Sequence, residues 1–286
     1  MQTIFKHSTV TGPNMGNRSL CLYILLLFTI QIFLTPKVGC AGGLTTQNDT
    51  QLYVLEKLKS HNIVFLGTIH RRQPILKFLS DLIPYLHEAQ VTHLGLEICS
   101  DQQEIIDSFL QTGSGLHDIA LHLQIECPEY RNLFTTIRSL DRTERPSVLA
   151  LDLPKSMYRG ENNRDEWIAG SIAKVFYQNP NAKILVLIGN LHVLKKIEWE
   201  DKVSNPNGFV RSYLNKLVPN CRMFSIGQCV HERPIECDFT REFGSVEGPV
   251  PVDCDRRFQG WNIGIMAAVA AKPSEIWELL DGVIIY

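Results

Sequence analysis

Two short segments share one spacing, a glycine followed after two residues by a histidine, and both could do chemistry. The first reads GTIH at 67–70 and the second reads GNLH at 189–192, each after a run of apolar residues. An imidazole can accept a proton or bind a metal ion near neutral pH. A single histidine after a strand is ordinary turn or capping chemistry. The repetition of the motif favours a functional site that contains His70 and His192.

Two carboxylates and one arginine accompany the histidines. Glu97 ends an apolar run, where an ionised carboxylate is costly unless it is paired or coordinated. Asp152 precedes Leu153-Pro154, so ordinary turn chemistry is its alternative interpretation. Arg164 begins a predicted helix, where the alternative is a solvated charge in the first turn. The acidic residues that follow it suit the dipole of a helix N-terminus.

These residues require elements that bring them to one place. Short runs rich in Val, Ile and Leu alternate along the chain with stretches whose apolar residues recur three and four positions apart. This pattern is typical of strands buried on both faces and of helices that cross over between them. We therefore predict an α/β fold with a central, mostly parallel sheet flanked by helices. The predicted strands are 63–67, 93–98, 148–153, 183–189, 223–226 and 283–286, and the predicted helices are 73–89, 101–111, 129–142, 164–178 and 206–218.

The carboxyl ends of the predicted strands would form the site, because ligands of open parallel sheets bind there. Two histidines and two acids leave their strands at this end, so we expect them to meet. Glycine in both motifs would allow a sharp turn and a close approach of the backbone. The predicted catalytic residues are His70, Glu97, Arg164 and His192, the predicted cofactor-binding residues are Gly67, Gly189, Asn190 and Asp152, and the predicted ligands of a divalent metal ion are His70, Glu97 and His192.

Residues 1–41 are predicted to direct export. A polar segment precedes the apolar run 20–34, and small residues follow it, which is the order of a secretory signal peptide. The run is shorter than the roughly twenty residues that span a bilayer comfortably. The segment is either cleaved after Ala41 or retained as an N-terminal anchor. Lipidation at Cys40 is a further alternative, which Lys37 disfavours. We expect the protein in the periplasm or outside the cell.

The rest of the chain is predicted to be a linker over 42–50 and a single domain over 51–286. Six of the eight cysteines lie in this domain, and an even number in an exported chain favours disulfides. Cys237 and Cys254 lie in a Gly- and Pro-rich segment, so we predict that a disulfide between them staples a C-terminal insertion over 230–262. The net charge is −2 and no basic run occurs, so nucleic acid is not an expected partner. Membrane contact is expected only through the N-terminal segment.

Together the motifs resemble those of the Tiki superfamily, which includes erythromycin esterases, TraB-like proteins and the ChaN-like haem-binding uptake proteins. In this chain they read GTIH at 67–70, GLEICSDQQ at 95–103, RDEWIAG at 164–170 and IGNLHV at 188–193. The ChaN-like branch is the most similar. It shares the LGLE segment followed by glutamine, the sequence VLALDLP before the arginine helix, and a final strand introduced by Asp-Gly at 281–282.

The resemblance implies an α/β fold with a polar site at the strand ends, and it carries His70, Glu97, Arg164 and His192 over as site residues. The chain departs from the ChaN-like pattern after the first motif. Thr68 and the sequence Arg-Arg-Gln at 71–73 stand where relatives often have acidic residues or further histidines. This difference weakens metal or haem binding by that loop. ChaN-like proteins hold haem through a tyrosine, and no tyrosine of this chain can be matched to it from the sequence.

Two functions follow. The first is an exported, metal-assisted hydrolase that cleaves an ester, lactone or peptide bond of a small-molecule or peptide substrate. The histidines and Glu97 would supply metal ligands or a general base, and Arg164 would stabilise developing negative charge. The alternative is a ChaN-like haem-binding protein of iron and haem uptake, without catalysis, in which a homodimer encloses the haem. The chemistry of the residues favours the first function, and the most similar branch favours the second.

Overall fold

The computed structural model describes residues 47–160, 162–196, 209–230, 238–244, 246–261 and 274–286. All of these residues belong to the unit 44–286. The predicted signal segment 1–41 and Cys237 lie outside the described residues. Within the described ranges, no helix is long and apolar enough to cross a membrane.

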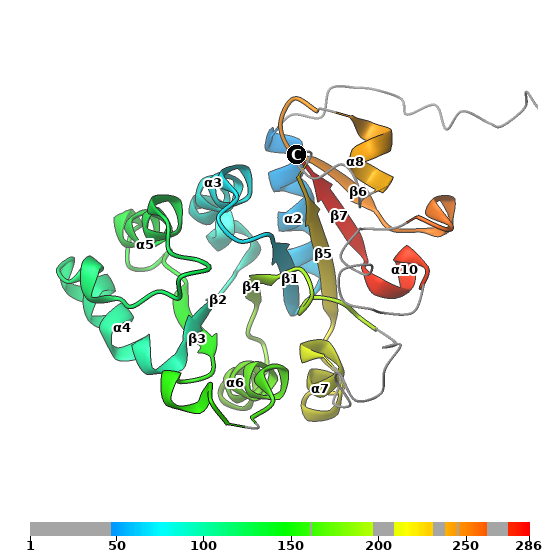
Figure 1. The fold of residues 1–286 in the computed structure, drawn as a ribbon. Helices are drawn as coiled ribbons and strands as arrows, with labels where there is room; N and C mark the ends of the chain where they lie inside the picture. Colours follow the sequence, from blue (N-terminus) through cyan, green and yellow to red (C-terminus); the bar gives the residue numbers. More distant parts are fainter. Residues whose placement is uncertain (1–46, 161, 197–208, 231–237, 245, 262–273) are drawn as a thin grey trace, which may run out of the picture. The chain divides into compact units, whose positions relative to one another are not determined.

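A sheet of seven strands forms the centre of this unit (Figure 1). The strands lie in the order β3-β2-β4-β1-β5-β7-β6. Of the pairs between these described strands, only β6 with β7 is antiparallel. The predicted α/β fold with a mostly parallel sheet is therefore confirmed. The strands are β1 (Ile63–Thr68), β2 (His93–Cys99), β3 (Ser147–Asp152), β4 (Ile184–Gly189), β5 (Met223–Cys229), β6 (Val250–Asp253) and β7 (Gly282–Ile285).

Helices cover both faces of the sheet. Successive side chains of a strand point to opposite faces, and here both sets are apolar, so both faces must be buried. On β1, Val64 and Leu66 belong to one buried core, and Ile63 and Phe65 belong to the other. All four side chains are fully buried, which explains why the strands lack a polar alternation. The first core includes α2 (Gln47–Ser60), α3 (Gln73–Leu82), α4 (Gln103–Thr112) and α5 (Pro128–Ser139). The second includes α6 (Arg164–Gln178), α7 (Val210–Leu217), α8 (Asp238–Phe243) and α10 (Ile276–Leu279).

The helices differ from the prediction in several places, and the short helices α8 and α10 were not predicted. The segment 73–89 divides into α3 and the 3-10 helix η1 (Ile83–Ala89), because Pro84 lacks the N–H that a continuing α-helix would need. Helix α2 was not predicted, and it begins at Gln47, so the last four residues of the expected linker are helical. Further 3-10 helices are η2 (Ser100–Gln102), η3 (Leu116–Asp118), η4 (Lys155–Met157) and η5 (Arg256–Phe258).

The segment 230–262, expected to be an irregular insertion, contains α8, β6 and η5. No disulfide occurs among the described residues, and Cys254 carries a thiol. Its predicted partner Cys237 lies outside them, so the structure does not support a disulfide-stapled insertion. Aromatic packing holds the described part instead. The ring of Phe239 lies 5.1 Å from that of Phe258 and 4.9 Å from that of Trp261, measured between centroids.

Candidate functional site

Four neighbouring strands place polar or glycine residues near their carboxyl ends. His70 lies two residues beyond the end of β1, Asp152 is the last residue of β3, and Gly189 is the last residue of β4. Glu97 lies within β2, where the pairing with β3 shifts register between Leu96 and Cys99. Such a bulge changes the direction of a strand side chain and is common beside functional sites.

Arg164 connects the carboxylates of β2 and β3 to His192. Its Nε and Nη2 donate to the two carboxylate oxygens of Asp152, each at 2.6 Å. Nη2 also donates to Glu97, and Nη1 lies 3.1 Å from Nε2 of His192. The arginine is the first residue of α6, whose start is fixed because the side chain of Asn163 accepts an N–H from the first turn.

Two buried carboxylates balance the charge of this guanidinium. The side chains of Asp152 and Glu97 are 3% and 6% exposed. Burial alone would raise the pKa of Asp152, but the hydrogen bonds and charge of Arg164 outweigh it and lower the pKa. Three of the five N–H groups of Arg164 donate to Asp152 and Glu97, and one N–H of Nη1 faces the His192 ring, so the arginine positions its neighbours. One N–H remains for the expected stabilisation of charge on a substrate.

His192 is held from both sides of its ring. Nδ1 lies 2.5 Å from a carboxylate oxygen of Asp165, in the first turn of α6. Burial alone would lower the pKa of His192, but the hydrogen bond and charge of Asp165 raise it, with Arg164 opposing. Asp165 was missing from the predicted site. The sequence offered it only as the second residue of RDEWIAG, where we explained an acid by the helix dipole.

His70 completes the cluster. A Cβ atom added to Gly189 would lie 3.5 Å from the His192 ring, 3.7 Å from the Glu97 carboxylate and 3.7 Å from the His70 ring. Because both rings lie this close to one point, the His70 and His192 rings are neighbours, and the Glu97 carboxylate lies beside both. The Nδ1 atom of His70 is buried and has no hydrogen-bond partner within the described ranges. Leaving such a polar atom unpaired costs about 1–3 kcal/mol, so a ligand or water that bonds to it is stabilised.

The predicted cofactor-binding residues all bond within the protein. The Asn190 side chain donates to the carbonyl of Gln228 at 2.8 Å and accepts its N–H at 3.0 Å. This amide fills the space over Gly67, where an added Cβ would lie 2.1 Å from it. The N–H of Gly189 donates to Glu97 at 2.7 Å. With Asp152 bonded to Arg164, these groups shape the site, and no cofactor is needed to explain them.

Gln228 joins the two histidine loops and was not predicted. Its side-chain nitrogen donates to the carbonyl of Gly67, and its side-chain oxygen accepts from the hydroxyl of Tyr286. The residue is fully buried in β5. We predicted that strand to end at residue 226. A lone glutamine directly after an apolar run was the signal that could have extended it.

The three predicted metal ligands meet, but they are not arranged to hold a metal. Among the residues that the structure describes, no group of three or more His, Cys, Asp or Glu side chains could hold a metal ion. Glu97 accepts bonds from Arg164 and Gly189, and both ring nitrogens of His192 contact other side chains. The adjacent guanidinium also opposes a cation. The metal-ligand prediction is therefore not supported, because the atoms of Glu97 and His192 that would bind the metal already have partners in the protein.

Tyr158 lies at the edge of the cluster. Its hydroxyl donates to Asp152, and the residue is 38% exposed. Burial raises the pKa of this phenol, and the hydrogen bond and charge of Asp152 raise it further. A tyrosine that ligates haem iron does so as a phenolate. The raised pKa therefore opposes that role for Tyr158.

No family model and no curated protein matches this sequence. Solved structures do match its fold. An erythromycin esterase mutant in its open conformation aligns over 84% of this chain and 93% of that chain, with 12% identity and a TM-score of 0.55. A protein from Bacillus cereus aligns over 84% and 91%, with 14% identity and a TM-score of 0.54.

ChaN of Campylobacter jejuni, solved with cofacial haem, aligns over 82% of this chain and 91% of that chain at 11% identity. Its TM-score of 0.45 is too low to support an argument about the branch. The chain has the fold of the erythromycin esterase, as the resemblance of its motifs predicted. At these identities the likeness shows the fold alone.

Proposed function

We propose that this chain is a hydrolase that cleaves an ester or related acyl bond of a small molecule, with His70 as the general base. The observation that carries the proposal is the buried, unpaired Nδ1 of His70 beside Glu97. Both ring nitrogens of His192 already contact partners, so His70 is the imidazole with a nitrogen to offer. The esterase fold of a structural neighbour supports the choice of an acyl bond.

In this reaction His70 takes a proton from water while the water oxygen attacks the acyl carbon. Arg164 and the N–H of Gly189 fix Glu97, which stabilises the imidazolium that forms. The same imidazolium then gives its proton to the oxygen of the departing alcohol as the carbon–oxygen bond breaks. Proton transfer of this kind contributes roughly 10²- to 10⁴-fold to rate.

A groove of about 1110 Å³ begins beside the loop that carries His70, and the side chains of His70, Glu97, Arg164 and His192 do not line it. We propose that the body of the substrate lies in this groove, with its acyl group reaching His70. The groove is lined by α3, by the start of α5 and by Arg71, the residue directly after His70. Arg71 has a φ of 59°, a left-handed conformation that is strained for a residue other than glycine. Such strain is typical of functional sites. A groove of this size fits a drug-sized molecule, which favours a small-molecule substrate over a long peptide.

Haem binding is the alternative function, and the predicted homodimer, which would enclose the haem, is part of that alternative. Tyr158 is the tyrosine that contacts Asp152 at the site, and its raised pKa disfavours a phenolate. We therefore place hydrolysis first. The proposed reaction needs no metal ion, since Glu97 is already bonded to Arg164 and His192 to Asp165.

Hydrolysis of p-nitrophenyl acetate and butyrate tests the proposal, with and without a metal chelator. We expect nitrophenolate release above the buffer rate that the chelator leaves unchanged. A parallel titration with haemin, followed by visible absorption, tests the alternative. No release from either ester would contradict the proposal, and a sharp Soret band of defined stoichiometry would then assign the chain to haem binding.

A further inference from the structure

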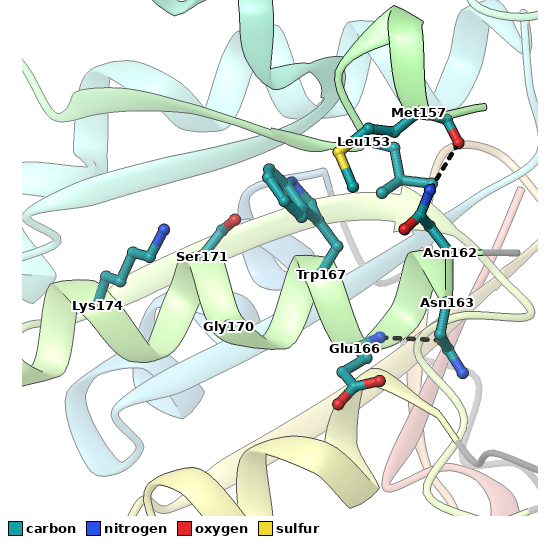
Figure 2. Close-up of a pocket in the computed structure, with 9 residues that line it drawn as sticks. All are labelled: Leu153, Met157, Asn162, Asn163, Glu166, Trp167, Gly170, Ser171 and Lys174. Atoms are coloured by element: carbon teal, nitrogen blue, oxygen red, sulfur yellow. Dashed lines mark hydrogen bonds between the residues drawn. The ribbon is translucent and has the colours of Figure 1, made fainter. Parts of the chain in front are cut away.

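A cavity of about 290 Å³ lies on the outer side of α6, against the segment that follows β3 (Figure 2). None of the side chains of His70, Glu97, Arg164 or His192 lines it. The cavity is therefore separate from the candidate catalytic cluster. Its volume is at the lower end for ligand sites and suits a molecule of one or two rings.

The middle of the cavity is aromatic and apolar. Trp167 lies there, with Leu153 and Met157 facing it from the preceding segment (Figure 2). The indole N–H of Trp167 is buried and has no acceptor among the residues that the structure describes. A buried donor without an acceptor is unfavourable, so a ligand that supplies an acceptor would be stabilised by it.

One end of the cavity carries a positive charge. The Nζ atom of Lys174 lies 5.9 Å from the centroid of the Trp167 ring, and Ser171 lies between the two in the helix. Lys174 makes no ion pair with any described residue. Glu166 lies at the opposite end, beside Asn162 and Asn163 (Figure 2). The charge is thus polarised along the cavity, with its cation next to the ring.

We propose that this cavity is a binding site for a small aromatic carboxylate. Its ring packs against Trp167, Leu153 and Met157, and its carboxylate bonds to Lys174 and to the hydroxyl of Ser171. The indole N–H supplies a further donor when the ring edge or carboxylate reaches it. This site does not depend on the proposed hydrolase activity.

Calorimetric titration with 2-naphthoate tests the site, with the uncharged 2-naphthalenemethanol as the matched probe. We expect the full chain to bind naphthoate at least tenfold more tightly than the alcohol. Lys174→Glu should remove this preference. Lys216→Glu is the matched control, because Lys216 lies 5.6 Å from the Tyr213 ring in a similar pairing and does not line this cavity. It should leave naphthoate binding unchanged.

Gly170→Leu tests the cavity without a change of charge. An added Cβ at Gly170 meets no atom within 4 Å, and leucine is the better helix former, so this variant should fold. Its side chain would fill the space, and we expect at least a tenfold loss of naphthoate binding with an undiminished melting temperature. Trp167→Phe keeps a ring and removes the N–H, and should weaken binding less. No binding by the native chain, or equal binding by Gly170→Leu, overturns the proposal.

Discussion

At the scale of single residues, the site is a group of side chains that hold one another and leave the His70 imidazole without a bond to them. Arg164 engages Glu97, Asp152 and His192, and Asp165 engages the other side of the His192 ring. An arginine can hold several partners because its N–H groups form a rigid planar fork. The Nδ1 of His70 is buried and has no partner in the described part of the chain.

The pairing of His192 with Asp165 predicts a dependence of stability on pH. The folded-state pKa of His192 is raised above 6.5, so its ion pair stabilises the protein fully below that pH. The contribution is lost as the pH rises through the raised folded-state value. Asp165→Asn should therefore lower the free energy of unfolding by about 2 kcal/mol near pH 5.5 and by clearly less near pH 9. Urea unfolding at both pH values measures the difference.

Glu166→Gln is the control for this experiment. It removes an acid from the same helical turn, and Glu166 is exposed and makes no bond to His192. Its small effect should not change with pH. A loss of stability in Asp165→Asn that is the same at both pH values would show that the His192 pair does not titrate as described.

At the scale of elements, the two histidine loops are joined by amides below the site. The Asn190 side chain bonds twice to the backbone of Gln228, and the Gln228 side chain bonds to Gly67 and Tyr286. The loops after β1 and β4 are therefore fixed to β5 and to the residue after β7. An imidazole on a loop can act only if such contacts hold the loop in one position.

Gly67→Ala should break this connection. The added Cβ would lie 2.1 Å from the Asn190 side-chain oxygen, which cannot move without losing its bond to Gln228. We expect a loss of about 2 kcal/mol in the free energy of unfolding, the value of two hydrogen bonds. Denaturant unfolding measures it. Gly170→Ala is the matched control, because no atom lies near that position, and it should stabilise the helix by up to about 1 kcal/mol.

Equal effects of the two alanine substitutions would contradict the account of the amide link. They would mean that the loops adjust freely around Asn190. In that case the glycine at position 67 would not be required by the Asn190 side chain that packs over it.

Some features of the fold and the site could be predicted from the sequence, and others could not. Six of the seven strands, the parallel sheet and the meeting of His70, Glu97, Arg164 and His192 follow from periodicity and from the geometry of parallel sheets. Strand β6 was not predicted, because its segment was expected to be irregular. The roles of Asp165 and Gln228 were not predicted either, because they depend on which side chain faces them across the sheet. The metal-ligand prediction was not supported for the same reason. The sequence shows that histidine and glutamate are present, but not that other side chains already bond to them.

At the scale of the whole molecule, we propose that residues 1–41 serve export and that the fold does not need them. All the described elements and both buried cores lie between Gln47 and Tyr286. A chain that begins at Gly42 should therefore be soluble and melt in one cooperative transition, which calorimetry would measure. If it aggregates while the full chain refolds in detergent, the apolar run 20–34 is part of the folded structure.

The central claim concerns the whole site, and His70→Gln tests it most directly. Glutamine keeps a polar side chain but cannot act as a base near neutral pH. We expect kcat for p-nitrophenyl butyrate to fall by about 100-fold or more, with an unchanged melting temperature. His117→Gln, an exposed histidine in η3, should keep the native rate. If His70→Gln and the native chain hydrolyse the ester at the same rate, His70 is not the base and the account is wrong.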